Sequence, residues 1–408
     1  MQIKHNKVII ILIIISLFMG EAKVYGAQKD NLSLYALSAV LYDASSNRVL
    51  YGKNENEVRA MASTTKIMTI VIALEYGNLS DTVTVSKYAA SQPDVQLDAV
   101  TGEKYILNDL LYAMMLMSYN DVAVAIAEYV ADRCLDGKQD PEVVKNRSKE
   151  ESKMRVEYFT GLMNAKAVEL GCDNTNFVTV NGLDGENDKG KHHTTAVELA
   201  KIAAYAINIK KIEQVCTTTS YSFSEINGKR TKSINTTDKF LYMMDGALGI
   251  KTGFTNDAGY CFVGALRRDG RLLITVVLGS GWPPHKNYKW EDTKLLMNYG
   301  LKNYFYEKLF VPCEKYCEIS VVNGKKDFLM TYIPFSLDMY LNENEKVDVI
   351  YRVPEYIDAP VDINDEIGKV LIYIDGDLYT SFSILSKEKI EKRDYIWHLR
   401  NLFKKFVF

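Results

Sequence analysis

The stretch ALGIKTGFTNDAGYCFVGALRRDGRLLITVVLGS, residues 247–280, decides the fold class of this chain. It contains three β-prone runs, and the turn pair Asp269-Gly270 separates the second from the third. An Asp-Gly pair between two apolar runs is a strong hairpin signal, so we expect antiparallel strands on both sides of it. A second hairpin is predicted at 36–53, where "ALSAVLYD" and "RVLYGKN" flank the turn residues "ASSN".

The residues between these two hairpins are typical of helices. Strands at both ends of a segment with a helical middle favour an α+β fold, in which helices pack on an antiparallel sheet joined from distant parts of the chain. A helix start signal stands at Ser63, before an apolar run. Further helices are predicted at 107–117, 121–133, 155–170 and 194–208, with another helix at 291–305 and a loop or exposed helix in the charged stretch 136–153.

The chain beyond Pro312 changes character. Short β-prone runs alternate with turn residues up to about 385, as in a small all-β module. The tail differs again, because Tyr395, Leu399, Leu402 and Phe406 recur at helical spacing among basic residues. This pattern predicts an amphipathic helix that lies on a membrane surface; docking of its apolar face on the β module is the alternative.

The first residues resemble a secretory signal peptide. Lys4 and Lys7 precede an apolar run at 8–19 that is too short to span a bilayer comfortably, and small residues follow it. A retained N-terminal anchor is the alternative. We therefore predict an exported protein at the outer face of the cytoplasmic membrane, with a signal peptide at 1–27, a first domain at 28–308, a β-rich domain at 309–386 and a membrane-associating helix at 387–408.

Composition narrows the function classes. The 408 residues carry a formal net charge of −3 with no basic excess, which argues against nucleic acid as a partner. The six cysteines are scattered, and Cys313 and Cys317 form either a disulfide or buried thiols. No Cys-x-x-Cys or His-Glu-x-x-His motif occurs, so we predict no metal and no cofactor. The adjacent His192 and His193 are interpreted as structural or rim residues.

Three short motifs together indicate a nucleophilic serine. Ser63 and Lys66 form a Ser-x-x-Lys match, which is weak alone, because 386–389 matches it too. Ser118-Tyr119-Asn120 lies in the break between two apolar helices, and Lys251-Thr252-Gly253 lies on a β-prone run. Ser-x-x-Lys, Ser-x-Asn and Lys-Thr-Gly in this order form the motif set of penicillin-binding proteins and serine β-lactamases.

The chemistry of acyl transfer fits these residue types. A serine hydroxyl is a poor nucleophile until a base takes its proton. Residues i and i+3 share a helix face, so Lys66 can reach the Ser63 oxygen. Lysine acts as a base only when it is neutral, and burial together with the nearby charge of Lys251 is expected to lower the pKa of Lys66.

The remaining motif residues suit substrate binding and proton transfer. Ser118 is expected to relay protons between Lys66 and a leaving nitrogen. Asn120 offers an amide that can hold Lys66 and a substrate amide together. Lys251 and Thr252 present a charge and a hydroxyl to a substrate carboxylate, and Gly253 is expected to let substrate approach the strand closely.

On these motifs, the chain resembles the low-molecular-mass penicillin-binding proteins, the D-alanyl-D-alanine carboxypeptidases of serine peptidase family S11. The stretches "FTGLMNAKAVELGCDNTNFVTVNGLDG", "HHTTAVELA" and "DGALGIKTGFTNDAGYCFVGA" are also similar to that family. The resemblance implies a helical cluster on a five-stranded antiparallel sheet. It also implies removal of the terminal D-alanine from peptidoglycan stem peptides through an acyl-serine, acylation by β-lactams, and an oxyanion hole made by the N–H groups of Ser63 and Phe254.

Two departures and three alternatives accompany this resemblance. Tyr119 stands where the family usually carries a small residue, so a ring at the cleft edge is expected to narrow access, and 136–153 is longer than usual. A class A β-lactamase is disfavoured because its Glu-x-x-Leu-Asn pattern is absent between motifs two and three. A non-catalytic muropeptide-binding protein of the same fold stays open. A Ser-His-Asp hydrolase is disfavoured because no Gly-x-Ser-x-Gly occurs.

Overall fold

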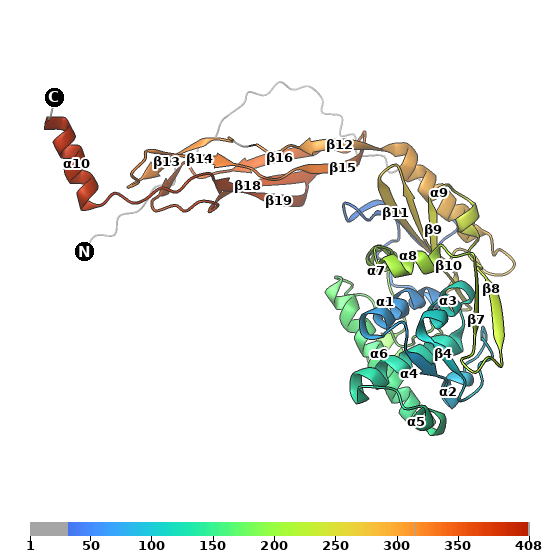
Figure 1. Cartoon of the computed structure of the whole chain (residues 1–408). Coiled ribbons are helices and arrows are strands. Elements are labelled where there is room, and N and C mark those ends of the chain that lie inside the picture. Colours follow the sequence, from blue (N-terminus) through green and yellow to red (C-terminus); the bar gives the residue numbers. More distant parts are fainter. Residues whose placement is uncertain (1–31, 314, 407–408) are drawn as a thin grey trace. The chain divides into compact units, whose positions relative to one another are not determined.

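The computed structural model describes residues 32–313 and 315–406, so the predicted signal peptide lies outside the described residues. A five-stranded antiparallel sheet organises the first domain, in the order β2-β1-β11-β10-β9 (Figure 1). This sheet, together with its helices, confirms the α+β fold class. Its strands are β1 (Ser38–Asp43), β2 (Arg48–Lys53), β9 (Ala247–Thr255), β10 (Gly259–Arg268) and β11 (Arg271–Leu278).

Both predicted hairpins form, and their pairing closes the sheet between distant parts of the chain. Asp269 and Gly270 have φ angles of 52° and 76°, the left-handed values that a tight hairpin turn needs at both central residues. Strand β1 then pairs with β11, with Ser38 opposite Leu278. The N-terminal hairpin therefore depends on residues more than 200 positions away, as the bracketed pattern predicted.

Both faces of the sheet are covered, because successive side chains of a strand point to opposite faces. Helix α9 (Tyr288–Asn303) packs on β10 and β11, where Leu41, Phe262 and Trp290 share one apolar core. The other face packs against α7 (Ala196–Ile207) and the remaining helices. That cluster comprises α1 (Lys66–Tyr76), α2 (Lys87–Ala90), α3 (Leu107–Met117), α4 (Asn120–Asp136), α5 (Pro141–Asn146), α6 (Lys149–Glu169) and α8 (Lys210–Cys216).

Short elements complete the first domain. Three two-stranded ribbons pair β3 (Thr82–Thr84) with β4 (Lys104–Ile106), β5 (Glu186–Asn187) with β6 (Gly190–Lys191), and β7 (Ser220–Ser224) with β8 (Thr231–Asn235). Two 3₁₀ turns are η1 (Ala62–Thr65) and η2 (Lys239–Tyr242). The charged stretch forms α5 and the start of α6, because Asp140 caps one helix and a Ser148–Glu151 capping box starts the other.

The predicted helix start at Ser63 is wrong by one turn. Helix α1 begins at Lys66, and Ser63 lies within η1, a 3₁₀ turn without a side-chain cap. Ala62 has a φ of 48°, a left-handed value that no helix accommodates. The Ser63 hydroxyl points to Asn181 and Lys66 instead of capping the helix.

The second domain is all β, as predicted, and its first strand begins at Tyr304, because α9 ends at Asn303. A six-stranded sheet has the order β16-β18-β19-β14-β13-β17, and β12 pairs with β15. The strands are β12 (Tyr304–Phe310), β13 (Glu318–Val322), β14 (Phe328–Tyr332), β15 (Leu337–Asn342), β16 (Val347–Arg352), β17 (Tyr356–Asp358), β18 (Glu366–Ile374) and β19 (Asp377–Ser386). Cys313 and Cys317 are free thiols.

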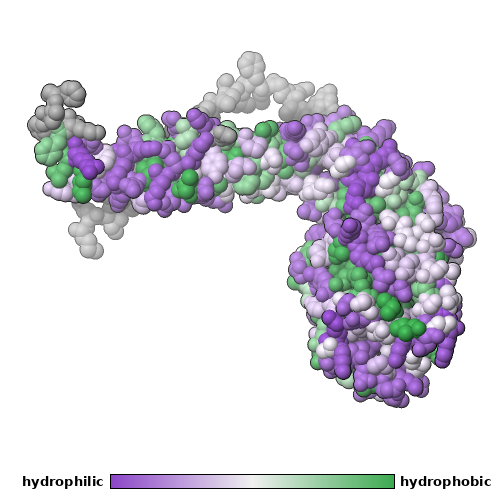
Figure 2. All heavy atoms as spheres, viewed as in Figure 1, coloured by the Kyte–Doolittle hydropathy of each residue, from purple (hydrophilic) through white to green (hydrophobic). Residues whose placement is uncertain are grey.

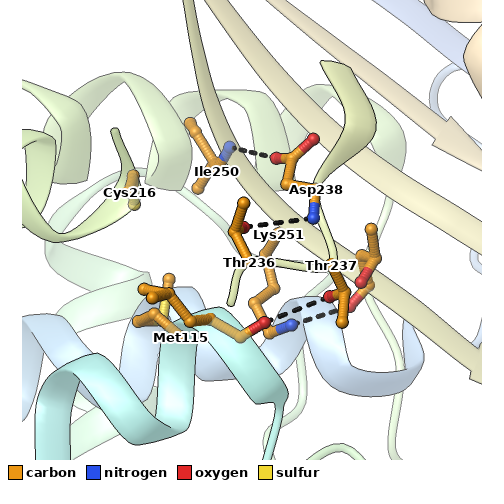
Figure 3. A pocket seen from close by; sticks show the side chains of 9 residues that line it. Met115, Cys216, Thr236, Thr237, Asp238, Ile250 and Lys251 are labelled. Carbon is orange, nitrogen blue, oxygen red and sulfur yellow. Dashed lines mark hydrogen bonds between the residues drawn. The ribbon is translucent and has the colours of Figure 1, made fainter. Parts of the chain in front are cut away.

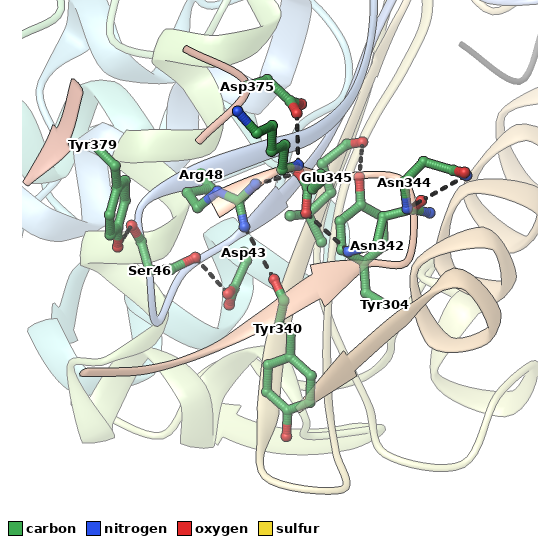
Figure 4. A network of polar contacts seen from close by, with 12 residues as sticks. Asp43, Ser46, Arg48, Tyr304, Tyr340, Asn342, Asn344, Glu345, Asp375 and Tyr379 are labelled. Atoms are coloured by element: carbon green, nitrogen blue, oxygen red, sulfur yellow. Dashed lines mark hydrogen bonds and ion pairs between the residues drawn. The ribbon is translucent and has the colours of Figure 1, made fainter. Parts of the chain in front are cut away.

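Polar contacts attach the β domain to the turn ends of the first sheet (Figure 4). Arg48 forms an ion pair with Glu345 and donates to the Tyr340 carbonyl at 3.0 Å. Tyr379 donates its hydroxyl to the carbonyl of Ser46 at 2.9 Å, in the turn between β1 and β2. The hydroxyl of Tyr340 reaches the Asp269 carbonyl, at the other hairpin turn. Because β10 starts opposite Phe254 and ends at that turn, these contacts lie at the far end of the sheet from the Lys-Thr-Gly motif.

Candidate active site

The side chains of the first two motifs converge on the amine of Lys66. Its Nζ lies 3.0 Å from Ser63 Oγ and 2.8 Å from Asn120 Oδ1. It also donates to the main-chain carbonyl of Asn181 at 2.5 Å, and the Ser63 hydroxyl approaches the same carbonyl at 3.3 Å. Ser63, Lys66 and Asn120 therefore form one hydrogen-bonded group, although they come from η1, α1 and α4.

Lys66 is fully buried among these partners, and none of them is a carboxylate. Burial places the pKa of Lys66 well below its ordinary value, and the charge of nearby Lys251 lowers it further. A neutral amine 3.0 Å from a serine hydroxyl can accept that hydroxyl's proton. Ser63 and Lys66 therefore have the arrangement of a candidate nucleophile and its general base.

Lys251 is buried as deeply as Lys66, and a carboxylate opposes the lowering of the pKa of each lysine, Asp121 for Lys66 and Asp238 for Lys251. Burial lowers the pKa of Lys251 to about 8, and Asp238 opposes that shift. Asp238 accepts from the N–H groups of Phe240 and Ile250, and burial raises its pKa to about 6. Asp238 thereby fixes the backbone of β9 next to Lys251, in a small cavity lined also by Cys216 and Thr236 (Figure 3).

The remaining predicted side chains, those of Ser118, Thr252 and Phe254, are half-buried or exposed. Ser118 is the left-handed residue between α3 and α4, and its half-buried hydroxyl forms no hydrogen bond with any residue that the structure describes. Thr252 is half-buried, and Phe254 is 38% exposed with its ring 4.6 Å from that of Tyr260. The predicted relay through Ser118 is therefore not preformed.

One sequence-based interpretation requires correction. Tyr119 was expected at the cleft edge, yet its side chain is only 7% exposed and belongs to the main apolar core. The side chain of a residue between Ser118 and Asn120 can turn inward because the chain reverses there between two packed helices. A Cβ at Gly253 would lie 2.9 Å from Ser63 N, so η1 packs directly against this glycine. The expected close approach of substrate at Gly253 stays a prediction.

Sequence reasoning missed the segment that contains Asn181 and Gly182. Gly182 has a φ of 87°, and a Cβ at this position would lie 2.0 Å from the Ala62 carbonyl oxygen. The carbonyl of Val180, the residue before Asn181, accepts a hydrogen bond from the Thr69 hydroxyl at 2.6 Å. These partners are backbone atoms, which leave no side-chain signature; the Asn-Gly pair itself, a turn signal, was the available indication.

An α+β domain with this serine and lysine pair at the junction of a helical cluster and an antiparallel sheet defines the penicillin-binding and serine β-lactamase fold class. The family model of D-alanyl-D-alanine carboxypeptidases, peptidase family S11, matches residues 24–134 and 155–281, so the chain belongs to this family. The model of the penicillin-binding protein 5 C-terminal domain matches residues 304–392. The first match leaves out 135–154, the stretch identified as longer than usual.

Relatives and solved structures agree with this assignment. The chain is 28% identical over 387 residues to the D-alanyl-D-alanine carboxypeptidase DacF of Bacillus subtilis, covering 93% of this chain and 92% of DacF. It is 31% identical to the D-alanyl-D-alanine carboxypeptidase of Streptomyces sp. K15, covering 66% of this chain and 88% of the relative. Penicillin-binding protein 5 of Haemophilus influenzae has the same fold, with a TM-score of 0.68 at 22% identity, covering 89% and 99% of the two chains.

We expect Gly182→Ala to lower the free energy of unfolding by more than the strain of a left-handed alanine alone would. Gly137 provides the control, because its φ of 76° is similarly left-handed and a Cβ there meets nothing within 4 Å. Gly137→Ala should lower the free energy of unfolding by about 1 kcal/mol. Gly182→Ala adds overlap with the Ala62 carbonyl, so the loss should reach about 3 kcal/mol. Urea unfolding of both variants measures the difference; equal losses would contradict the close approach.

Proposed function

We propose that this protein is a serine-type D-alanyl-D-alanine carboxypeptidase that removes the terminal D-alanine from peptidoglycan stem peptides through an acyl-serine. The observation that carries the proposal is the fully buried Lys66 amine at 3.0 Å from the Ser63 hydroxyl. The family assignment supports the substrate class, since the matched family and the named relatives are D-alanyl-D-alanine carboxypeptidases.

The proposed reaction follows from the protonation states of the two buried lysines. Neutral Lys66 takes the proton of Ser63 Oγ as this oxygen attacks the carbonyl carbon of the penultimate D-alanine. The N–H groups of Ser63 and Phe254 bind the developing oxyanion. The C–N bond breaks, and the departing D-alanine amine receives the proton from Lys66, with Ser118 as the relay once substrate orders its hydroxyl. Water then hydrolyses the ester and regenerates Ser63.

The remaining groups are proposed to orient the substrate. Lys251, a cation below about pH 8, and the Thr252 hydroxyl bind the terminal carboxylate of the stem peptide. Asn120 is held by the carbonyls of Pro93 and Asp94, at 3.1 and 3.0 Å, and presents its amide oxygen to Lys66. A penicillin likewise offers a reactive carbonyl and a carboxylate, so we propose that it acylates Ser63. The resulting acyl-enzyme is expected to hydrolyse slowly.

The proposal is tested with purified protein, a diacetyl-lysyl-D-alanyl-D-alanine peptide and a fluorescent penicillin. Wild type should release D-alanine and take one label per chain, and Ser63→Ala should do neither while it keeps its melting temperature. A wild type without release or label would exclude the enzyme and favour the muropeptide-binding alternative. Rapid turnover of the penicillin would favour a β-lactamase.

The pH dependence of acylation should separate the two lysines. The base works when neutral, so acylation should rise with pH through the lowered pKa of Lys66, well on the acid side of an ordinary lysine. Carboxylate binding needs a charged Lys251, so kcat/KM should fall as pH rises through about 8. Lys251→Arg stays charged, so a variant with reduced activity but no alkaline decline is expected. A decline that persists in this variant would assign it to another group.

We further propose that the exported protein is held on the membrane surface by its C-terminal helix, α10 (Tyr395–Phe406). Figure 2 shows hydrophobic residues on the surface of α10, where Tyr395, Ile396, Leu402 and Phe403 are 56–77% exposed. This exposure supports a surface-binding role and disfavours docking on the β domain. No helix within 32–313 and 315–406 is long and apolar enough to cross a bilayer.

A truncation tests the anchor only if it leaves the β domain intact. Residues 387–393 still contact that domain, because Ile390 is buried in its core and Arg393 donates to the Gly324 carbonyl. A chain ending at Asp394 should therefore fold but lose binding to vesicles with anionic lipid, whereas full-length mature protein should co-sediment with them. Leu402→Asp in the full chain should weaken binding as well. Equal sedimentation of all three proteins would exclude the anchor.

A further inference from the structure

Thr65, between the candidate nucleophile and its base, is part of a hydrogen-bond chain outside the three motifs. Its side chain is fully buried. Its Oγ1 donates to the carbonyl of Ala62 at 2.8 Å and lies 2.7 Å from Nε2 of His192. His192 is buried as well, in the segment that follows Asn181 and Gly182.

The direction of this chain is fixed by the second ring nitrogen. Nδ1 of His192 accepts the N–H of Val178 at 3.0 Å, so it carries no proton. In the neutral ring, Nε2 therefore carries the hydrogen and donates it to Thr65, whose own hydrogen goes to Ala62. Burial lowers the pKa of His192 to about 3, which agrees with a neutral ring whose Nδ1 accepts a hydrogen bond.

The carbonyl at the end of the chain belongs to the peptide that carries the Ser63 N–H. The C=O and N–H of a trans peptide point in opposite directions from one rigid plane. Fixing the Ala62 oxygen therefore fixes the direction of the Ser63 N–H. The plane needs such support, because Ala62 holds it at a left-handed φ of 48°, which a residue with a Cβ rarely adopts.

We propose that Thr65 and His192 are positioning residues that orient the Ser63 N–H as an oxyanion-hole donor, by holding the carbonyl of Ala62. The inference rests on the proposed function, in which this N–H binds the oxyanion. His192 also ties Val178 to Thr65, so it sets the nucleophile turn in register with the segment that presents the Asn181 carbonyl to Lys66. The paired histidines thus differ in their partners, since the His193 ring contacts the nearby Lys191 carbonyl.

Thr65→Val and Thr65→Ser form the matched test. Valine keeps the shape but removes the hydroxyl, whereas serine keeps the hydroxyl. Because a misaligned oxyanion donor weakens only the transition state, Thr65→Val should slow penicillin acylation by about ten- to a hundredfold. The affinity of the preceding non-covalent complex should change little. Thr65→Ser should restore most of the rate.

His192 variants give an independent pair. The amide of glutamine can place an N–H near the position of Nε2, whereas the shorter asparagine replaces only the Nδ1 acceptor. His192→Gln should therefore retain more acylation than His192→Asn at a comparable melting temperature. If Thr65 and His192 act through one chain, Thr65→Val with His192→Asn should be no slower than the slower single variant.

The outcomes distinguish the two proposals. Wild type that takes no penicillin would overturn the proposed function and this inference together. Labelled wild type with an equal rate for Thr65→Val would overturn the inference alone. A loss of folded protein with an unchanged rate per folded molecule would also overturn it, because the chain would then have a purely structural role. Additive losses in the double variant would overturn it too, because the two residues would then act independently.

Discussion

The peptide between Ala62 and Ser63 is the constraint on which the rest of the site depends. Two glycines lie against it, since a Cβ at Gly182 would fall 2.7 Å from Ser63 N and one at Gly253 would fall 2.9 Å from the same atom. One glycine comes from the segment between α6 and α7, and the other comes from β9. The nucleophile turn is therefore enclosed by backbone, so its geometry is determined by how the helical cluster and the sheet pack together.

Two buried lysines with different surroundings lie at the candidate site. Removing an ammonium from water is costly, so burial lowers the pKa of both. Lys66 is bonded to neutral oxygens, and its pKa lies well below the ordinary value although the charge of Asp121 opposes the shift. Lys251 has Asp238 close by, and its pKa is lowered to about 8. Environments that push the pKa values of two like groups apart are a mark of acid–base sites. Asp238 also binds the backbone of β9.

The sequence predicted what is encoded locally. The Asp269-Gly270 turn carries its hairpin in two residues, and Ser63 and Lys66, three residues apart, lie on one turn. The same spacing at Ser386 and Lys389 forms no such turn, because Ser386 ends β19. The features that escaped prediction depend on tertiary contacts. A left-handed Ala62 has no local signal, because alanine favours helix, and the Asn181 carbonyl is available at any residue. Tyr119 was expected at the cleft edge, and its burial depends on how two helices pack, which the motif spacing does not reveal.

The end of the sheet opposite Ser63 is where the β domain contacts it. Strand β10 runs from its pairing with Phe254, beside the nucleophile, to the turn whose Asp269 carbonyl accepts from Tyr340 of the β domain. Strand β1 likewise ends at the turn bound by Tyr379. The β domain thus holds the sheet by its turns and leaves the end beside Ser63 free of it. A one-residue shift of β9 against β10 would exchange Gly253 for a side chain against Ser63. The pairing of β9 with β10, within the first domain, therefore places this glycine against the turn that carries Ser63.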